Sequence, residues 1–112
     1  MLRFVVILSA LICLAVSSPA ISEEGDQHLS IQGLDWDSTQ IFMGGMGYGV
    51  IYFNTTLLMD GKPKLYCVPP GVGVNGRLLW DLASKVLKGP HKPDIVAVAA
   101  LDELKKKYPC AK

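Results

Sequence analysis

The segment FMGGMGYGVIYFN, residues 42–54, decides the fold, because it holds four glycines within six residues. Such a density is typical of a phosphate-binding loop or of a helix with a bare packing face. A nucleotide-hydrolase loop requires a lysine and a serine or threonine after its glycines, but Val50 and Ile51 follow here. A dinucleotide-binding loop requires a preceding strand and the spacing G-x-G-x-x-G, and the sequence offers neither. The segment therefore indicates a helix in which Gly45 and Gly49, four residues apart, form a bare face that another helix can approach.

The glycine segment lies within residues 38–59, which contain no proline and are densely apolar. Side chains that cap helices stand at the start of this stretch, at Asp35, Asp37 and Ser38, and an Asp-Gly pair at residues 60–61 is a stop signal. The pattern predicts one helix of about twenty residues. The β-branched and aromatic residues 50–53 leave a strand as the alternative.

The flanking segments are less regular. Residues 21–35 are polar and acidic, and they predict a frayed start with one short turn. Three prolines within residues 62–71 disfavour helix, so this segment is expected to be a connection. Asn75 then precedes a second predicted helix at residues 76–87. The apolar stripe of that helix consists of Leu78, Leu79, Leu82 and Val86.

A loop at residues 89–93 separates the second helix from a third at residues 94–107. Asp94 is expected to cap the third helix. The inner face of the third helix is predicted to consist of Ile95, Val98, Ala99, Leu101 and Leu104. In the second helix, Trp80 lies off the apolar stripe, which indicates a second contact surface. The pattern as a whole predicts an all-α fold, a small bundle of three to four helices.

The first twenty residues have the pattern of a secretory signal peptide. A short basic start at residues 1–3 precedes an uncharged apolar run at residues 4–16, and Ala20 stands where a signal peptidase requires a small residue. The run is too short for a membrane span, which needs about 20 residues, so a membrane anchor is the weaker alternative. We expect cleavage after Ala20, with Ser22 as the alternative site. The product is a periplasmic domain, residues 21–112, that makes no contact with the membrane.

Two cysteines, Cys67 and Cys110, fall within residues 21–112. An even pair in an exported protein predicts a disulfide, with two buried free thiols as the alternative. A disulfide closing a loop of this length stabilises a domain by about 4 kcal/mol. Such a staple suits a domain this small, because small domains bury only a modest fraction of their surface.

Charge is unevenly distributed along the exported part of the chain. Residues 21–60 carry six acidic side chains and no lysine or arginine, whereas residues 61–112 carry ten basic and four acidic ones. This asymmetry can steer a partner, but no basic face interleaved with aromatic residues indicates nucleic-acid binding. His28 and His91 have no cysteine or carboxylate beside them at metal-ligand spacing, and no nucleophile is paired with a base. We therefore expect neither an enzyme nor a metal or other cofactor.

An aromatic-cysteine element at residues 66–69 precedes the second predicted helix, and Tyr108-Pro109-Cys110 follows the third. With these two elements the C-terminal half resembles the Rap/Tai immunity proteins of type VI secretion, and the resemblance covers residues 40–110. Residues 46–54, MGYGVIYFN, are similar to the glycine-containing first long helix of that family, which in some members ends in an Asn where Asn54 stands. Many members carry a second cysteine pair in the first half, which this chain lacks. The other matching elements are Tyr66-Cys67-Val68-Pro69, an amphipathic helix at residues 78–86, the loop at Pro90, Ala100-Leu101 and Tyr108-Pro109-Cys110.

The resemblance implies a small α-helical periplasmic protein, often a homodimer, with a Cys67–Cys110 disulfide. It also implies that the protein binds and blocks a peptidoglycan-cleaving amidase delivered by neighbouring cells and so protects its owner. The expected contacts lie in two loops, because proline preorganises both and lowers the entropy cost of binding. The candidate partner-binding residues are Lys62, Lys64, Pro90, His91 and Lys92.

Two other functions are alternatives. A small disulfide-bonded periplasmic stress chaperone is also expected to be helical, but the few groups that titrate near neutral pH weigh against acid-triggered client binding. A hydrolase is the weaker alternative, because the sequence contains no catalytic constellation.

Overall fold

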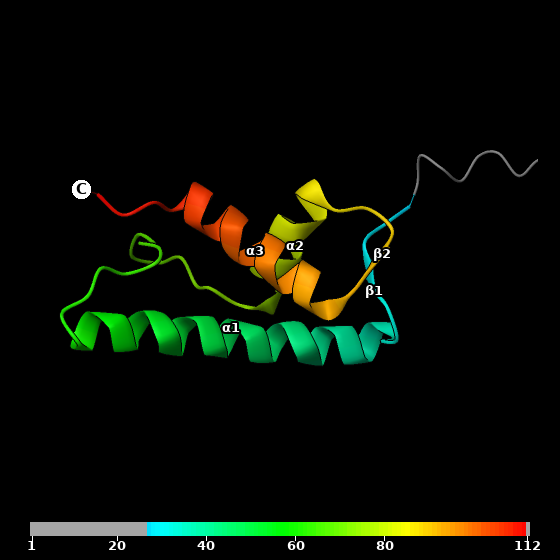
Figure 1. The fold of residues 1–112 in the computed structure, drawn as a ribbon, viewed down its shortest axis with the longest axis horizontal. Helices are drawn as coiled ribbons and strands as arrows, with labels where there is room; N and C mark the ends of the chain where they lie inside the picture. The colour runs from blue at the N-terminus through cyan, green and yellow to red at the C-terminus, as the bar shows by residue number, and fades with distance from the viewer. Residues whose placement is uncertain (1–26, 112) are drawn as a thin grey trace, which may run out of the picture.

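The computed structural model describes residues 27–111, and these fold into three α-helices and one pair of two-residue strands. Figure 1 shows α1 along one side of the molecule, with the later helices packed over its other side. The described part is therefore mostly helical, as predicted, but it also contains a small strand pair. The predicted signal peptide, residues 1–20, lies outside the described residues. In chain order the elements are β1 (Ser30–Ile31), α1 (Trp36–Met59), α2 (Gly76–Val86), β2 (Pro90–His91) and α3 (Pro93–Lys107).

The long helix α1 confirms the helix predicted around the glycine segment and rules out the strand alternative. It begins at Trp36, because the Asp35 carboxylate accepts a hydrogen bond from the backbone N–H of Ser38 at 2.7 Å. It ends at Met59, followed by Asp60 and by Gly61, whose φ of 73° a side chain would disfavour.

The central helix α2 packs against both α1 and α3. Its N-terminus is fixed by Asn75, whose side-chain oxygen accepts a hydrogen bond from the backbone N–H of Leu78 at 2.9 Å. The buried residues of α2 are Leu79, Leu82 and Ala83, whereas Val86 of the predicted stripe is exposed. The core therefore lies between α2 and its two neighbours. It consists of Leu29, Ile31, Met43, Tyr66, Val74, Leu79, Leu82, Ala83, Val96, Ala100 and Leu104.

The close approach of α1 and α2 does not use the predicted glycine pair. Gly45 and Gly49 are exposed, and a Cβ built on either would have no heavy atom within 4 Å. The crossing uses Gly47 and Gly76 instead. A Cβ on Gly47 would stand 3.2 Å from the carbonyl carbon of Asn75, and a Cβ on Gly76 would stand 2.7 Å from the backbone nitrogen of Gly44. Successive helical residues are rotated by about 100°, so four clustered glycines spread over several faces. The packing face is chosen by the partner helix, and spacing within α1 alone does not reveal it.

The third helix, α3, differs from its prediction in both its cap and its buried face. Its N-cap is Lys92, which makes no side-chain cap hydrogen bond, and Pro93 occupies the first turn, so Asp94 is not the cap. The buried residues are Val96, Ala100 and Leu104, whereas Ile95 and Val98 of the predicted face are exposed. Apolar residues occupy several faces of the first two turns of α3. The smaller of them, Val96 and Ala100, are fully buried and allow α3 to pack closely on α2.

Residues 89–93, predicted to be a loop, contain β2, which pairs in parallel with β1. The backbone N–H of Ser30 donates to the Gly89 carbonyl at 3.0 Å, and that of Gln32 donates to the His91 carbonyl at 2.9 Å. This pairing buries Leu29 and Ile31 in the core, so residues 29–32 are part of the fold. The frayed start predicted for residues 21–35 is therefore wrong for this stretch, because backbone hydrogen bonds to residues 89 and 91 hold it.

Candidate functional site

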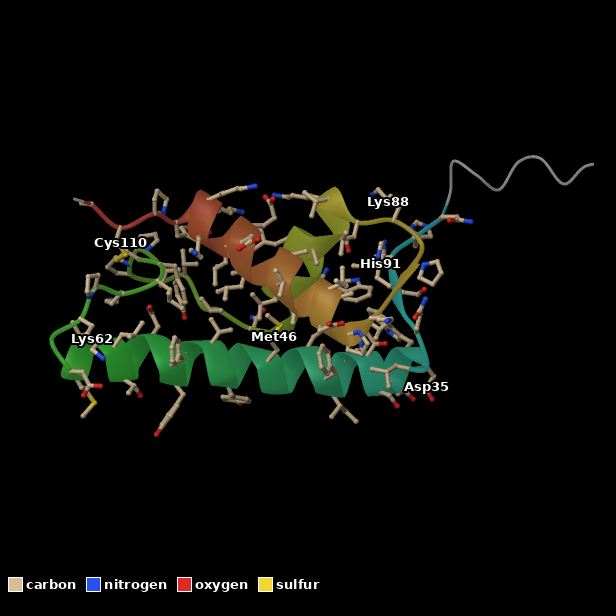
Figure 2. All side chains as sticks on the ribbon, in the orientation of Figure 1. Asp35, Met46, Lys62, Lys88, His91 and Cys110 are labelled. Atoms are coloured by element: carbon tan, nitrogen blue, oxygen red, sulfur yellow. A yellow bond between two sulfur atoms is a disulfide. The ribbon has the colours of Figure 1, made fainter. Side chains whose placement is uncertain are left out.

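A disulfide between Cys67 and Cys110 closes one end of the molecule, which confirms the predicted pairing. The backbone N–H of Cys67 also donates a hydrogen bond to the Tyr108 carbonyl at 2.8 Å. Figure 2 shows Cys110 at the same end of the molecule as Lys62. The disulfide therefore fixes the connection after α1 to the end of α3.

The amide of Asn54 holds the same connection from the side of α1. Its nitrogen donates to the Tyr66 carbonyl at 3.1 Å, and its oxygen accepts from the backbone N–H of Leu65 at 2.7 Å. Asn54 is only 6% exposed, so both hydrogen bonds replace contacts with water. Burial also raises the pKa of the Tyr66 hydroxyl above its ordinary value. Sequence reasoning did not predict that the Asn54 side chain is buried, although one amide in an apolar run is itself a signal of a buried hydrogen bond.

The candidate partner-binding residues occupy two ends of the molecule. Lys62 lies at the disulfide end, whereas His91 lies near Asp35 at the opposite end (Figure 2). Lys62, Pro90 and Lys92 are exposed, and Lys64 and His91 are half-buried. The Nε2 atom of His91 lies 2.9 Å from the Lys88 carbonyl, within hydrogen-bond distance. The structure does not bring the two groups together in one chain, and their contact with a partner stays a prediction.

The side of α1 turned away from α2 and α3 is apolar and exposed (Figure 2). Four large side chains on it are exposed over most of their surface: Ile41 at 77%, Tyr48 at 80%, Tyr52 at 75% and Met59 at 80%. We call this surface the outer α1 face and define it by these four residues together with Gly45 and Thr55. The sequence analysis did not separate this face of the helix from the buried one. The missed signal was the regular spacing of these residues along the helix.

A hollow of about 570 Å³ lies where the first half of α1 meets the start of α2. The rings of Trp36 and Trp80 form one wall, with centroids 5.5 Å apart in an edge-to-face arrangement. Trp80 was predicted to serve a second contact surface, and its contact is with Trp36. The polar residues at the hollow are Thr39, Gln40, Asn75, Arg77 and Asp81. The hollow therefore has an apolar wall and polar groups around it.

Within residues 27–111, no group of three or more His, Cys, Asp or Glu side chains is placed to hold a metal ion. In the same part of the chain, no helix is both long and apolar enough to cross a membrane. Two features mark the described surface. One is residues 62–67, held by Asn54 and by the disulfide, which we call the clamped loop after α1. The other is the outer α1 face.

The chain matches no family model, no curated protein and no solved structure.

Proposed function

We propose that the protein is a periplasmic immunity protein that binds and occludes a peptidoglycan amidase delivered by type VI secretion. One observation carries the proposal: the two cysteine elements behind the family resemblance, Tyr66-Cys67 and Tyr108-Pro109-Cys110, meet at one end of the fold. They are joined by the disulfide and by the hydrogen bond from the Cys67 N–H to the Tyr108 carbonyl. The elements that make the resemblance specific thus act as one structural unit.

The clamped loop is suited to occlusion because its ends have little freedom. Asn54 holds Leu65 and Tyr66, the disulfide holds Cys67, and Pro63 has one fixed backbone dihedral between Lys62 and Lys64. A loop that is ordered before binding loses less conformational entropy when it enters a cleft. Lys62 and Lys64 would offer their ammonium groups to acidic or carbonyl oxygens at the rim of the amidase cleft.

The proposed compartment agrees with the cysteine chemistry. Disulfides form and persist in oxidising compartments such as the periplasm, and are rare in reducing ones. The Cys67–Cys110 bond therefore supports export of the domain. The signal peptide predicted at residues 1–20 would direct the domain to the periplasm.

The test uses the oxidised protein, residues 21–112, and the amidases encoded beside its gene. We expect one amidase to form a stoichiometric complex and to lose its activity on peptidoglycan. The variant Lys62→Glu/Lys64→Glu should weaken inhibition, whereas Arg77→Glu/Lys85→Glu makes the same charge change at exposed positions of α2, outside both candidate loops, and should not. Full inhibition by the loop variant would remove the loop from the interface. Absence of binding to every candidate amidase would overturn the proposed function.

The chaperone alternative is favoured by a separate observation, the exposed apolar side chains of the outer α1 face. A chaperone should suppress aggregation of several unrelated unfolded proteins, whereas an immunity protein should bind one folded partner. Light scattering of two unrelated denatured clients, with and without the protein, separates these functions.

A further inference from the structure

We infer that the hollow between α1 and α2 binds a neutral sugar chain built from acetamido pyranose rings. The hollow measures about 570 Å³, and small-ligand sites typically measure about 300–1,000 Å³. A second hollow of about 260 Å³ adjoins it, because Gly44, Asn75 and Gly76 line both. We call the two hollows together the α1–α2 groove. A ligand can extend from one hollow into the other.

One side of the α1–α2 groove is a row of α1 residues spaced four apart. Each member of the row lines at least one of the two hollows: Trp36, Gln40, Gly44 and Tyr48. Residues four apart on a helix form one ridge along its surface. The row is about 18 Å long, since it covers twelve residues at about 1.5 Å per residue. This length suits a chain of several rings better than one compact ligand.

Gly44 leaves the middle of the groove open. A Cβ on Gly44 would have no heavy atom within 4 Å, although Gln40 and Tyr48 on either side of it in the row carry long side chains. A glycine inside a helix lowers its stability, so an interior glycine is expected to serve a contact. Within the chain, the close contacts between α1 and α2 would be blocked by side chains at Gly47 and Gly76, not at Gly44. The space above Gly44 is therefore available to a ligand.

Aromatic rings stand at both ends of the groove. Trp36 and Trp80 meet edge to face at one end, and Tyr48 lies at the other. Trp36 is 55% exposed and Tyr48 is 80% exposed, so packing within the chain leaves much of both rings uncovered. A pyranose ring carries C–H groups on its faces, and these pack on the negative face of an aromatic ring. Each exposed ring can therefore accept the face of one sugar ring.

The polar groups around the groove favour a neutral ligand that both donates and accepts hydrogen bonds. The amides of Gln40 and Asn75 do both, and the carboxylate of Asp81 accepts. The Asn75 oxygen already accepts from the Leu78 N–H, which leaves its nitrogen to donate. Sugar hydroxyls and acetamido groups match this mixed set. Arg77 balances the charge of Asp81, so the groove prefers neither an anion nor a cation.

Peptides fit the groove less well than a sugar chain does. Peptides that add a strand need a free sheet edge, and this groove lies between two helices. Proline-rich peptides do bind aromatic-lined grooves. Their prolines have no backbone N–H, however, so they would leave the Asp81 carboxylate without a donor. The hydroxyls of a sugar chain supply donors along its whole length.

The choice of acetamido sugars rests on the proposed function. An exported protein that meets a peptidoglycan amidase also meets the glycan strands of peptidoglycan, which consist of acetamido pyranose rings. Each acetamido group adds an N–H donor and a methyl group to the ring. The groove lies in the half of α1 next to Asp35, whereas the clamped loop begins at Lys62 at the opposite end (Figure 2). The protein could therefore hold a glycan strand while its loop faces the amidase.

The first test is tryptophan fluorescence of the oxidised protein, residues 21–112, without any amidase. Trp36 and Trp80 are the only tryptophans of the sequence, so a change in emission reports a ligand at the groove. The probes are chitotetraose, cellotetraose, which has the same linkage without acetamido groups, and a proline decapeptide. We expect a saturable change with chitotetraose. Cellotetraose should bind at least about tenfold more weakly, and the peptide should not bind.

The second test fills the groove from its floor. Gly44→Leu should keep the helix content in circular dichroism, because a Cβ there meets open space, and should raise the dissociation constant of chitotetraose at least about tenfold. Gly45→Leu is the matched control, since its Cβ also meets open space but lies on the outer α1 face. It should bind as wild type does. Wild type and Gly45→Leu should also sediment with purified peptidoglycan, whereas Gly44→Leu should not.

Several results would overturn the inference. One is the absence of saturable binding to any probe, and another is chitotetraose binding that Gly44→Leu leaves intact. Binding of the proline decapeptide alone would assign the groove to a peptide. Equal affinity for cellotetraose and chitotetraose would overturn the acetamido assignment and with it the link to peptidoglycan. Because sugar binding is measured without amidase, failure of this site and failure of the proposed function are distinguishable.

Discussion

Gly76 packs so close to Gly44 that a side chain on Gly76 would collide with the backbone of α1. A Cβ on Gly76 would stand 2.7 Å from the backbone nitrogen of Gly44 and 2.8 Å from the carbonyl carbon of Met43. Both obstacles are backbone atoms of α1, so they cannot move aside as a flexible side chain would. The distance between α1 and α2 is therefore set by the absence of a side chain at Gly76.

The first prediction follows from this crossing. Gly76→Ala should lower the free energy of unfolding by about 1–3 kcal/mol, because the added methyl group forces the two helices apart. Gly73→Ala is the matched control, since a Cβ there meets no heavy atom within 4 Å. It should leave stability unchanged or raise it by up to about 1 kcal/mol. Urea unfolding followed by circular dichroism measures both, and equal stabilities would contradict the crossing.

The second prediction concerns the Asn54 amide. Asn54→Ala should lower the free energy of unfolding by about 1–3 kcal/mol, because it leaves the half-buried Leu65 N–H and the buried Tyr66 carbonyl without their protein partners. Gln40→Ala removes an exposed amide from the same helix and should change stability by no more than about 0.5 kcal/mol. Unfolding by urea again provides the measurement. A mild effect of Asn54→Ala would show that water satisfies both groups.

The third prediction concerns the Cys67–Cys110 disulfide, whose cysteines are 43 residues apart. Cys67→Ala/Cys110→Ala should lose about 4 kcal/mol of stability, because the unfolded chain regains the entropy of an open loop. Adding reductant to the wild-type protein should lower its melting temperature, and adding it to the variant should not. A wild-type protein insensitive to reduction would contradict this prediction.

The fourth prediction concerns pH. The hydrogen bond from the Ser38 backbone N–H lowers the pKa of the Asp35 carboxyl below its ordinary value of 3.8, and a Ser38 side-chain hydrogen bond adds to this effect. A lowered pKa in the folded state means that the ionised cap contributes stability above pH 3.8, and that this contribution is lost as the pH falls through the folded-state pKa. Asp35→Asn keeps a capping oxygen that does not titrate.

The measurement is the urea midpoint of wild type and Asp35→Asn from pH 5 to pH 2. The advantage of wild type over the variant should shrink as the pH falls. A difference that stays constant over this range would show that the Asp35 charge contributes nothing to the cap.

The helices and their N-terminal caps at Asp35 and Asn75 were predictable, because these signals lie within a few residues of the structure they cause. The disulfide was predictable because residues 21–112 contain only two cysteines. The pairing of β1 with β2 was not, since each strand has two residues and their partners lie about sixty residues apart. Such short strands carry no periodic pattern, and long-range contacts fix them.

The faces of the helices were less predictable than the helices themselves. In α3, both the predicted set around Ile95 and the observed set around Val96 follow helical spacing. In α1, glycines lie on several sides, and apolar residues cover both the buried side and the outer α1 face. Periodicity identifies a face only where the opposite side is polar. The clamped loop after α1 was missed for another reason, because its hydrogen bonds join residues 54 and 65–66 across a turn of the chain.

The covalent loop between Cys67 and Cys110 also determines how the protein responds to tension. A pull applied at residues 27 and 111 is carried through the disulfide, which bypasses every residue between the two cysteines. Only the chain up to Cys67 can lengthen, so α1 unravels while the 43-residue separation between the cysteines contributes no extension. Reduction of the bond makes the residues between the two cysteines available for extension. In a single-molecule stretching experiment, the gain in chain length on unfolding would therefore be shorter for the oxidised protein than for the reduced one.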